Sequence, residues 1–273
     1  MDMLIGVDLG QMQSFAAVAA IWRTPVLGPD GQVARTSTGI PIHRYSVAGL
    51  RRHPLGTSYA CVVEHLVERV RRPEMGPRPM VVLDGSGVGA PVCELVRTAL
   101  KATPSIEVWA VTITPGASVT EAGFRRVRVA KVEIVSSLRA LLEQDLLRIP
   151  PELPFAGDLK RELADLRVKI TDASHEVFEA APGGADDLCS AVALPIWLST
   201  WLDSRGTFIA GPGPRVGPLE NTSAASRAVT QGGRITFPDR RGGDADRRGW
   251  RPGFGGIPLG PRRGSGIFGD PDQ

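Results

Sequence analysis

Cysteine is scarce in this chain of 273 residues: only Cys61, Cys93 and Cys189 occur, far apart from one another. Their odd number and the lack of a Cys-x-x-Cys pair argue against a disulfide framework or a zinc site, and favour a reducing compartment. No apolar run reaches the roughly 18 residues that a membrane span needs, and no signal peptide precedes the first expected strand. We therefore expect a soluble cytoplasmic protein with no membrane partner.

Lysine is also rare, with four residues against 28 arginines, and the net charge of +3 is unevenly distributed. Residues 206–273 contain ten arginines, no lysine and six acids, and they hold 16 of the 32 glycines. Such a segment buries too little apolar surface to offset its ordering entropy. We expect a folded domain over 1–205 and a disordered Gly/Pro/Arg-rich tail over 206–273, which serves either as a plain linker or as a loose contact for nucleic acid.

Hydrophobic patterns within residues 1–205 alternate between strand-like and helix-like periods. They predict strands over 4–9, 14–22, 42–50, 79–84 and 106–114, and helices over 57–72, 91–100, 130–147 and 185–202. Residues 158–170 read as a helix that turns into extended chain, and 175–181 as a short strand. Three antiparallel strands followed by alternating helices and strands indicate an α/β fold, with a mixed five-stranded sheet flanked by helices.

Carboxylates occur where two of the expected strands end and where the last expected helix begins. Asp8 ends the first strand in "LIGVDLG", Asp84 ends the fourth in "PMVVLDGSG", and Asp186 and Asp187 open the last helix. A carboxylate that leaves a buried strand needs a metal ion, a basic side chain or a metal-bound phosphate beside it. Several carboxylates at one sheet edge repel one another, and hard oxygen ligands favour Mg²⁺ or Mn²⁺. Two such ions would suit in-line hydrolysis of a phosphodiester.

Three motifs carry a resemblance to a known family. "GVDLG", "VVLDGSGVGAPVCELV" and "GGADDLCSAVALPIW" resemble the acidic motifs of the nuclease domain of phage terminase large subunits, which has the ribonuclease-H-like (RuvC-like) fold. The likeness spans roughly residues 3–202 and includes the helices before the second motif and after it. It implies a metal-dependent endonuclease that cuts double-stranded DNA by a two-metal mechanism during phage DNA packaging, in a bacterial or phage-infected cell.

The resemblance also implies roles for single residues. Asp8 matches the first metal-binding aspartate, Asp84 the second and Asp187 the third, with Asp186 as an auxiliary acid. Lys131 stands where such nucleases often have a lysine near the scissile phosphate. The residues themselves also allow roles without a metal. Asp84 could form a turn, Asp186 or Asp187 could cap a helix, and Lys131 could be an ordinary surface lysine.

Two further features bear on DNA and on partners. Arg125, Arg126 and Arg128 in "GFRRVRV" are the candidates for contacts with the DNA backbone, or else solvated charge. The chain has no Gly-Lys pair, so it lacks the phosphate-binding loop of the packaging ATPase that accompanies the nuclease in a complete terminase large subunit. Three alternatives follow: a packaging ATPase or a portal protein is a separate partner, the chain is a stand-alone nuclease, or the sequence is one domain of a longer protein.

Other functions use the same motifs. A RuvC-like junction resolvase or a transposase-like nuclease would share the carboxylates. "GVDLG" and "LDGSGVG" also resemble the phosphate loops of actin-like kinases, but about 205 folded residues hold only half of that fold. An inactive DNA-binding scaffold would have no reason to keep clustered acids.

Overall fold

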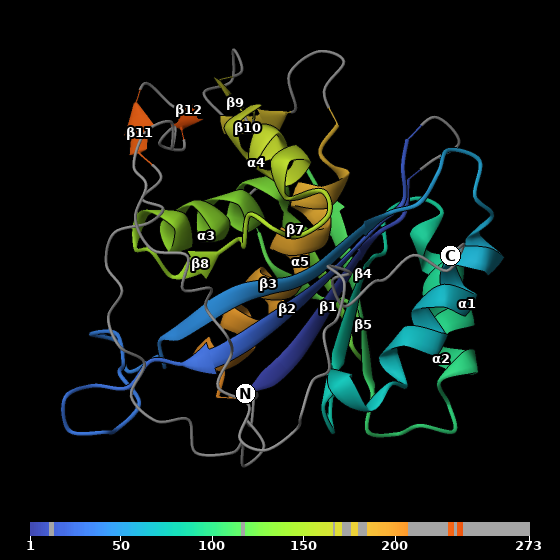
Figure 1. The fold of residues 1–273 in the computed structure, drawn as a ribbon, viewed down its shortest axis with the longest axis horizontal. Helices are drawn as coiled ribbons and strands as arrows, with labels where there is room; N and C mark the ends of the chain where they lie inside the picture. The colour runs from blue at the N-terminus through green and yellow to red at the C-terminus, as the bar shows by residue number, and fades with distance from the viewer. Residues whose placement is uncertain are drawn as a thin grey trace.

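The computed structural model describes residues 1–10, 14–115, 118–165, 167–170, 176–179, 185–206, 229–231 and 234–236. Its centre is an eight-stranded mixed sheet with helices packed on both faces (Figure 1). Within the described part of the chain, no helix is long and apolar enough to cross a membrane.

The bounds of the strands and helices are as follows. The strands of the main sheet are β1 (Asp2–Asp8), β2 (Ala17–Pro25), β3 (His43–Arg52), β4 (Met80–Asp84), β5 (Glu107–Thr114), β6 (Thr120–Glu121), β7 (Arg126–Ala130) and β8 (Leu147–Arg148). The helices are α1 (Tyr59–Val70), a 3-10 turn (Pro73–Met75), α2 (Gly89–Ala99), α3 (Lys131–Glu143), α4 (Ala156–Asp165) and α5 (Asp187–Ser204). Two small pairs lie outside this sheet: β9 (Arg167–Ile170) with β10 (Glu176–Glu179), and β11 (Val229–Gln231) with β12 (Arg234–Thr236).

The sheet has the strand order β6-β7-β5-β4-β1-β2-β3-β8. Strands β1, β2 and β3 are antiparallel neighbours, whereas β4, β5 and β7 run parallel to β1. The five expected strands are β1 to β5 and form the centre in the order β3-β2-β1-β4-β5, which confirms the ribonuclease-H-like mixed sheet. The structure adds β7 and β6 at one edge and β8 at the other.

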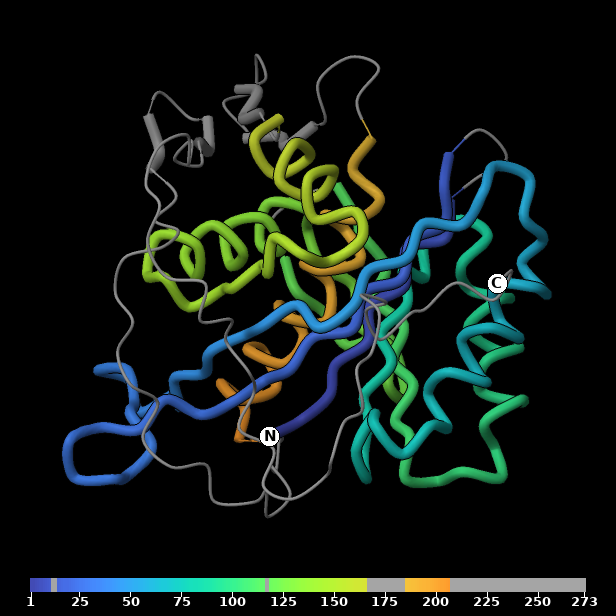
Figure 2. The backbone as a smooth tube through the Cα atoms, in the orientation of Figure 1, coloured from blue at the N-terminus to red at the C-terminus, as the bar shows by residue number. Residues whose placement is uncertain are grey.

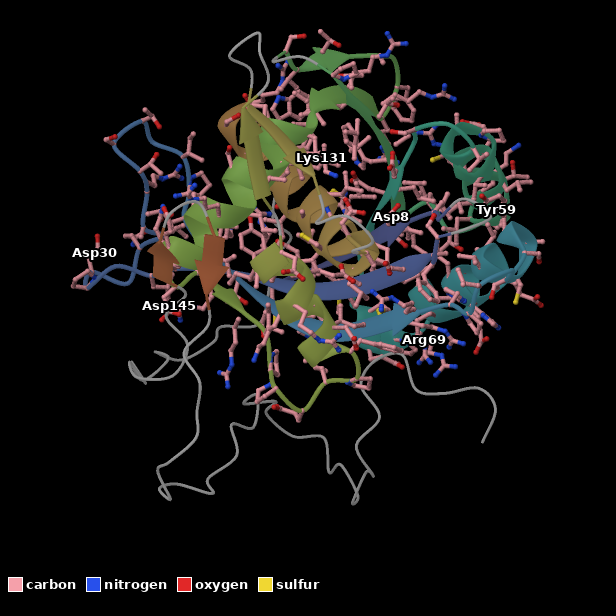
Figure 3. All side chains as sticks on the ribbon, turned by 90° about the horizontal axis from the view of Figure 1, so that it is seen from above. Asp8, Asp30, Tyr59, Arg69, Lys131 and Asp145 are labelled. Atoms are coloured by element: carbon pink, nitrogen blue, oxygen red, sulfur yellow. The ribbon has the colours of Figure 1, made fainter. Side chains whose placement is uncertain are left out.

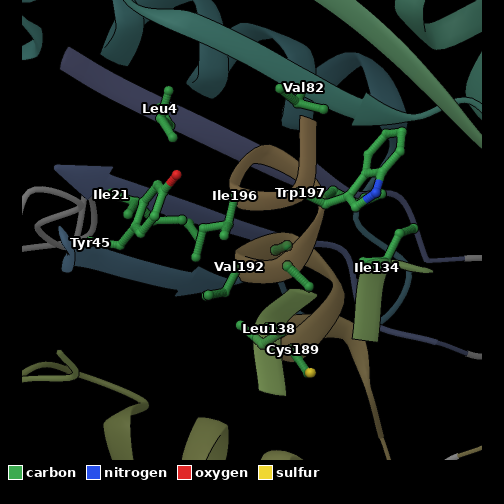
Figure 4. Close-up of a cluster of buried hydrophobic side chains, with 14 of the residues drawn as sticks. Leu4, Ile21, Tyr45, Val82, Ile134, Leu138, Cys189, Val192, Ile196 and Trp197 are labelled. Carbon is green, nitrogen blue, oxygen red and sulfur yellow. The ribbon is translucent and has the colours of Figure 1, made fainter. Parts of the chain in front are cut away.

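Each face of the sheet carries its own apolar core, because successive side chains of a strand point to opposite faces. Leu4 and Val82 pack with α3, α4 and α5, while Val7 and Leu83 pack with α1 and α2. Figure 4 shows the first of these cores, where the side chains of α5 meet those of β1, β3, β4 and α3. The helices on the two faces are separated by the sheet in Figure 1.

Helix α5 is the central helix and lies directly against β1. Gly6 makes this approach possible, because a Cβ atom there would stand 1.8 Å from the backbone oxygen of Ala191. At the C-terminal end of α5, Asp203 binds the buried Arg23 of β2, whose other nitrogen lies 3.4 Å from Asp2 at the start of β1. The N-terminus of α5 is therefore directed toward the carboxyl end of β1.

The expected tail lies almost entirely outside the described residues, apart from the short strands β11 and β12. The connection between β2 and β3 contains backbone hydrogen bonds between Val26 and Ile42 and between Thr36 and Ile40. It extends beyond the sheet as an arm of residues 26–42, which Figure 2 shows clearly.

Candidate metal centre

Asp8 and Asp84 end two neighbouring parallel strands. They directly follow Val7 and Leu83, which are paired in register, and by the alternation of side chains both point to the face that α5 covers. Both are partly exposed. Asp84 Oδ1 also accepts the backbone N–H of Ser86 at 2.8 Å, which fixes the turn that follows β4.

Asp186 and Lys131 form an ion pair, and the charges of both act on Asp8 and Asp84. Asp186 occupies the N-cap position of α5, and Lys131 is the first residue of α3. Lys131 Nζ donates to Asp186 Oδ2 at 2.7 Å. Figure 3 shows Lys131 and Asp8 among the inner side chains of the domain, and both Asp186 and Lys131 influence the ionisation of Asp8.

Asp187 is held by an arginine from β3. The register of the sheet aligns Asp8 with Ala17, and Ala17 with Arg52, so Arg52 stands two strands away on the same face. Arg52 Nε donates to Asp187 Oδ2 at 2.7 Å, and its Nη2 donates to Asp187 Oδ1 at 3.1 Å. This two-point contact is the strong form of an arginine–carboxylate pair. Asp187 is only 5% exposed, so this ion pair is largely removed from water.

Glu162 of α4 belongs to the same network and was missed in the sequence. Its Oε1 accepts a hydrogen bond from Arg52, and its Oε2 accepts the backbone N–H of Cys189 at 2.8 Å. Burial raises the pKa of Glu162 to about 7, although the Cys189 N–H lowers it. A signal was available: Glu162 lies three residues after Leu159 and one before Leu163, on the buried face of a helix.

Burial and neighbouring carboxylates both disfavour ionisation of the strand aspartates. The pKa of Asp8 lies well above its ordinary value, first because of burial and then because of the charges of Asp84, Asp186 and Asp187; Lys131 opposes the shift. Burial also raises the pKa of Asp84. Without a bound cation, the cluster therefore resists full ionisation, and a divalent ion would relieve that cost.

The donor set fits a hard divalent ion, since all of its atoms are carboxylate oxygens. In the arrangement that the structure gives to the described residues, no three acid, histidine or cysteine side chains are close enough together to enclose an ion. Two of the four carboxylates instead bind a cationic side chain: Asp186 binds Lys131 and Asp187 binds Arg52. A metal at Asp186 would have to displace the ammonium group, and one at Asp187 the guanidinium group.

The arginines expected to contact DNA do not join this cluster. Arg126 and Arg128 alternate along β7 with Val127 and Val129, whose side chains lie in the core beneath α5, so the two arginines point to the opposite face of the sheet. Arg126 pairs there with Glu94 of α2 at 2.6 Å. Arg125 precedes the strand and lies 3.6 Å from Glu107. The sequence could not reveal this, because it gives no face for a strand whose partner is unknown.

No protein-family model matches the sequence, and no curated protein matches it either. Solved structures that are similar to the chain include the large terminase nuclease of the thermophilic phage G20c with bound magnesium, at 21% identity over 71% of this chain and 80% of that chain, with a TM-score of 0.44. The nuclease domain of the large terminase subunit of bacterial virus Sf6 is 13% identical over 72% and 88%, with a TM-score of 0.48. The terminase nuclease domain of human cytomegalovirus is 14% identical over 73% and 82%, with a TM-score of 0.41. These structures belong to the family that the three acidic motifs resemble.

Proposed function

We propose that the chain is a metal-dependent endonuclease that hydrolyses phosphodiester bonds of double-stranded DNA. The observation that supports the proposal is that Asp8 and Asp84 end neighbouring parallel strands, while the charges of Asp186 and of its partner Lys131 act on Asp8. Burial, and after it the neighbouring carboxylates, raise the pKa of Asp8, and a bound cation would oppose both effects.

Asp8, Asp84 and Asp186 would hold two Mg²⁺ or Mn²⁺ ions. Such ions, when bound, supply an activated water and stabilise the leaving oxygen of an in-line displacement. Asp8 ends β1, the strand that pairs with β4 and packs against α5, and it would be one of the ligands. Asp187 stays a predicted ligand, but its two-point contact with Arg52 makes Asp186 the better candidate for the third position.

Lys131 has a role of its own in this proposal. Its ammonium group neutralises Asp186 in the metal-free protein. If Asp186 served as a metal ligand, the ammonium group of Lys131 would be available to bind a nonbridging oxygen of the scissile phosphate. The cellular context that we propose is DNA packaging with a separate ATPase or portal protein, and it rests on the motif resemblance alone.

The test is a plasmid-nicking assay with MnCl₂ or MgCl₂, using the full chain. Asp8→Asn and Asp84→Asn should abolish nicking and also abolish Mn²⁺ uptake in a calorimetric titration, because each removes a ligand that no neighbour replaces. Asp30→Asn is the matched control: it removes an exposed carboxylate on the arm, far from Asp8 in Figure 3, and should leave both readouts unchanged. Nicking that survives in both Asp8→Asn and Asp84→Asn would refute the proposal.

A further inference from the structure

Asp186 occupies a capping position without acting as a cap. An N-cap aspartate ordinarily accepts the backbone N–H two or three residues later. The side chain of Asp186 makes no such hydrogen bond and receives Lys131 Nζ instead. The N–H three residues later belongs to Cys189, which is buried, so it needs an acceptor from elsewhere.

Glu162 supplies that acceptor from the neighbouring helix. Its Oε2 lies 2.8 Å from the Cys189 nitrogen, and its Oε1 is bound by Arg52. The groups that position Glu162 are themselves held in place. Leu159 and Leu163, on the same helix, are fully buried, and Arg52 is bound to Asp187. Glu162 is itself 7% exposed, so its carboxylate is held in one place with both oxygens occupied.

We propose that Glu162 is a positioning residue that caps α5 from outside and thereby leaves the carboxylate of Asp186 free to pair with Lys131, in the position that the proposed function requires. Without Glu162, the Cys189 N–H would be buried and unpaired, which costs free energy. The nearest acceptor along the chain is then Asp186 itself. By turning to cap its own helix, Asp186 would leave the metal centre. The importance of this for metal binding rests on the proposed function.

Metal-free protein can show whether Asp186 becomes the cap of α5 when Glu162 is removed. Thermal unfolding in EDTA is measured for Glu162→Ala, Asp186→Ala and the double variant. In the wild-type background, Asp186→Ala should change the Tm little, since Asp186 caps nothing, repels Asp8, and loses only a half-exposed ion pair with Lys131. In the Glu162→Ala background, the same change should lower the Tm by about 2–4 °C, because Asp186 has become the cap. Equal effects in the two backgrounds would overturn the proposal.

The consequence for the metal centre is tested by Mn²⁺ titration calorimetry. Glu162→Ala should weaken Mn²⁺ binding by about tenfold or more, as for other residues that orient a ligand. Glu162→Gln keeps one acceptor oxygen for the Cys189 N–H but turns its NH2 group toward Arg52, so it should bind Mn²⁺ more tightly than Glu162→Ala; a folded Glu162→Gln that binds Mn²⁺ no better than Glu162→Ala would contradict a capping role. Asp203→Ala is the matched control, since it removes a buried carboxylate at the other end of α5 and should lower the Tm without changing Mn²⁺ affinity.

The two experiments separate the two proposals. Failure of the wild-type protein to take up Mn²⁺ would refute the proposed function. The unfolding of the single and double variants in EDTA would still decide whether Glu162 replaces Asp186 as the cap. Wild-type Mn²⁺ affinity in folded Glu162→Ala would refute the positioning role and leave the proposed function standing.

Discussion

Gly6 in the middle of β1 is the position where one added carbon atom should do most harm. A Cβ there would lie 1.8 Å from the backbone oxygen of Ala191, and 2.7 and 2.8 Å from Cδ and Cγ of Pro195. Contacts between carbon and a carbonyl oxygen begin near about 3.3 Å. Gly6→Ala therefore requires α5 to move away from β1 by roughly 1.5 Å, the difference between these two distances.

Helix α5 has little room for such a movement. Its side chains are buried along nearly its whole length, and its last turn is fixed by the ion pair between Asp203 and Arg23. Overpacking of a core costs about 1–3 kcal/mol, and a collision between two backbones belongs at the upper end of that range. Since about 1 kcal/mol corresponds to 2–4 °C for a domain of this size, we expect the Tm of Gly6→Ala to fall by roughly 6–12 °C.

The assay is thermal unfolding followed by circular dichroism, with Gly157→Ala as the matched control. Gly157 lies on the exposed side of α4, and a Cβ atom there would meet nothing within 4 Å. Replacing glycine by alanine in a helix stabilises it by about 0.5–1 kcal/mol, so this variant should melt slightly above the wild type. A Gly6→Ala protein that melts within 2 °C of the wild type would refute the close contact between β1 and α5.

Three further outcomes follow from single contacts. Ser58 Oγ accepts the N–H of Cys61 at the start of α1, so Ser58→Ala should cost about 1 kcal/mol in urea unfolding. Asp203→Ala leaves the buried guanidinium of Arg23 without its main carboxylate and should cost about 3–5 kcal/mol, measured by the same method. Burial lowers the pKa of His53 to about 4, so its neutral form is favoured in the folded state; stability should fall as the pH drops from 7 to 4, and less steeply in His53→Gln.

The central fold was predictable because its strands carry clear local patterns. β1 and β4 are short apolar runs that end in an aspartate, and the periodicity of α1 was complete in the sequence. Strand β7 was missed, although "RVRVA" alternates with the period of a strand, because it was read as the approach to the helix that begins at Lys131. Strand β8 has two residues and depends on pairing with β3, so no local signal could identify it.

The candidate site was predictable in part, because aspartates that end neighbouring parallel strands must meet at one edge. The order of β1 and β4 in the sheet was enough to bring Asp8 beside Asp84. The pairing of Arg52 with Asp187, and of Glu162 with the first turn of α5, depends on helices that approach from far along the chain. Such contacts carry no spacing signal, so the sequence alone could not find them.

The adjacent Asp186 and Asp187 at the start of α5 bind different partners. Successive residues at a helix start are rotated by about 100° around its axis, so their side chains cannot reach the same point. Asp186 is directed toward Lys131 and the strand carboxylates, and Asp187 toward Arg52. The charge of Asp187 next to the buried site would be costly without Arg52, and that of Glu162 would be costly for the same reason. Arg52 thus binds both acids that hold the first turn of the helix, whereas Asp186 pairs with Lys131 on another side of it.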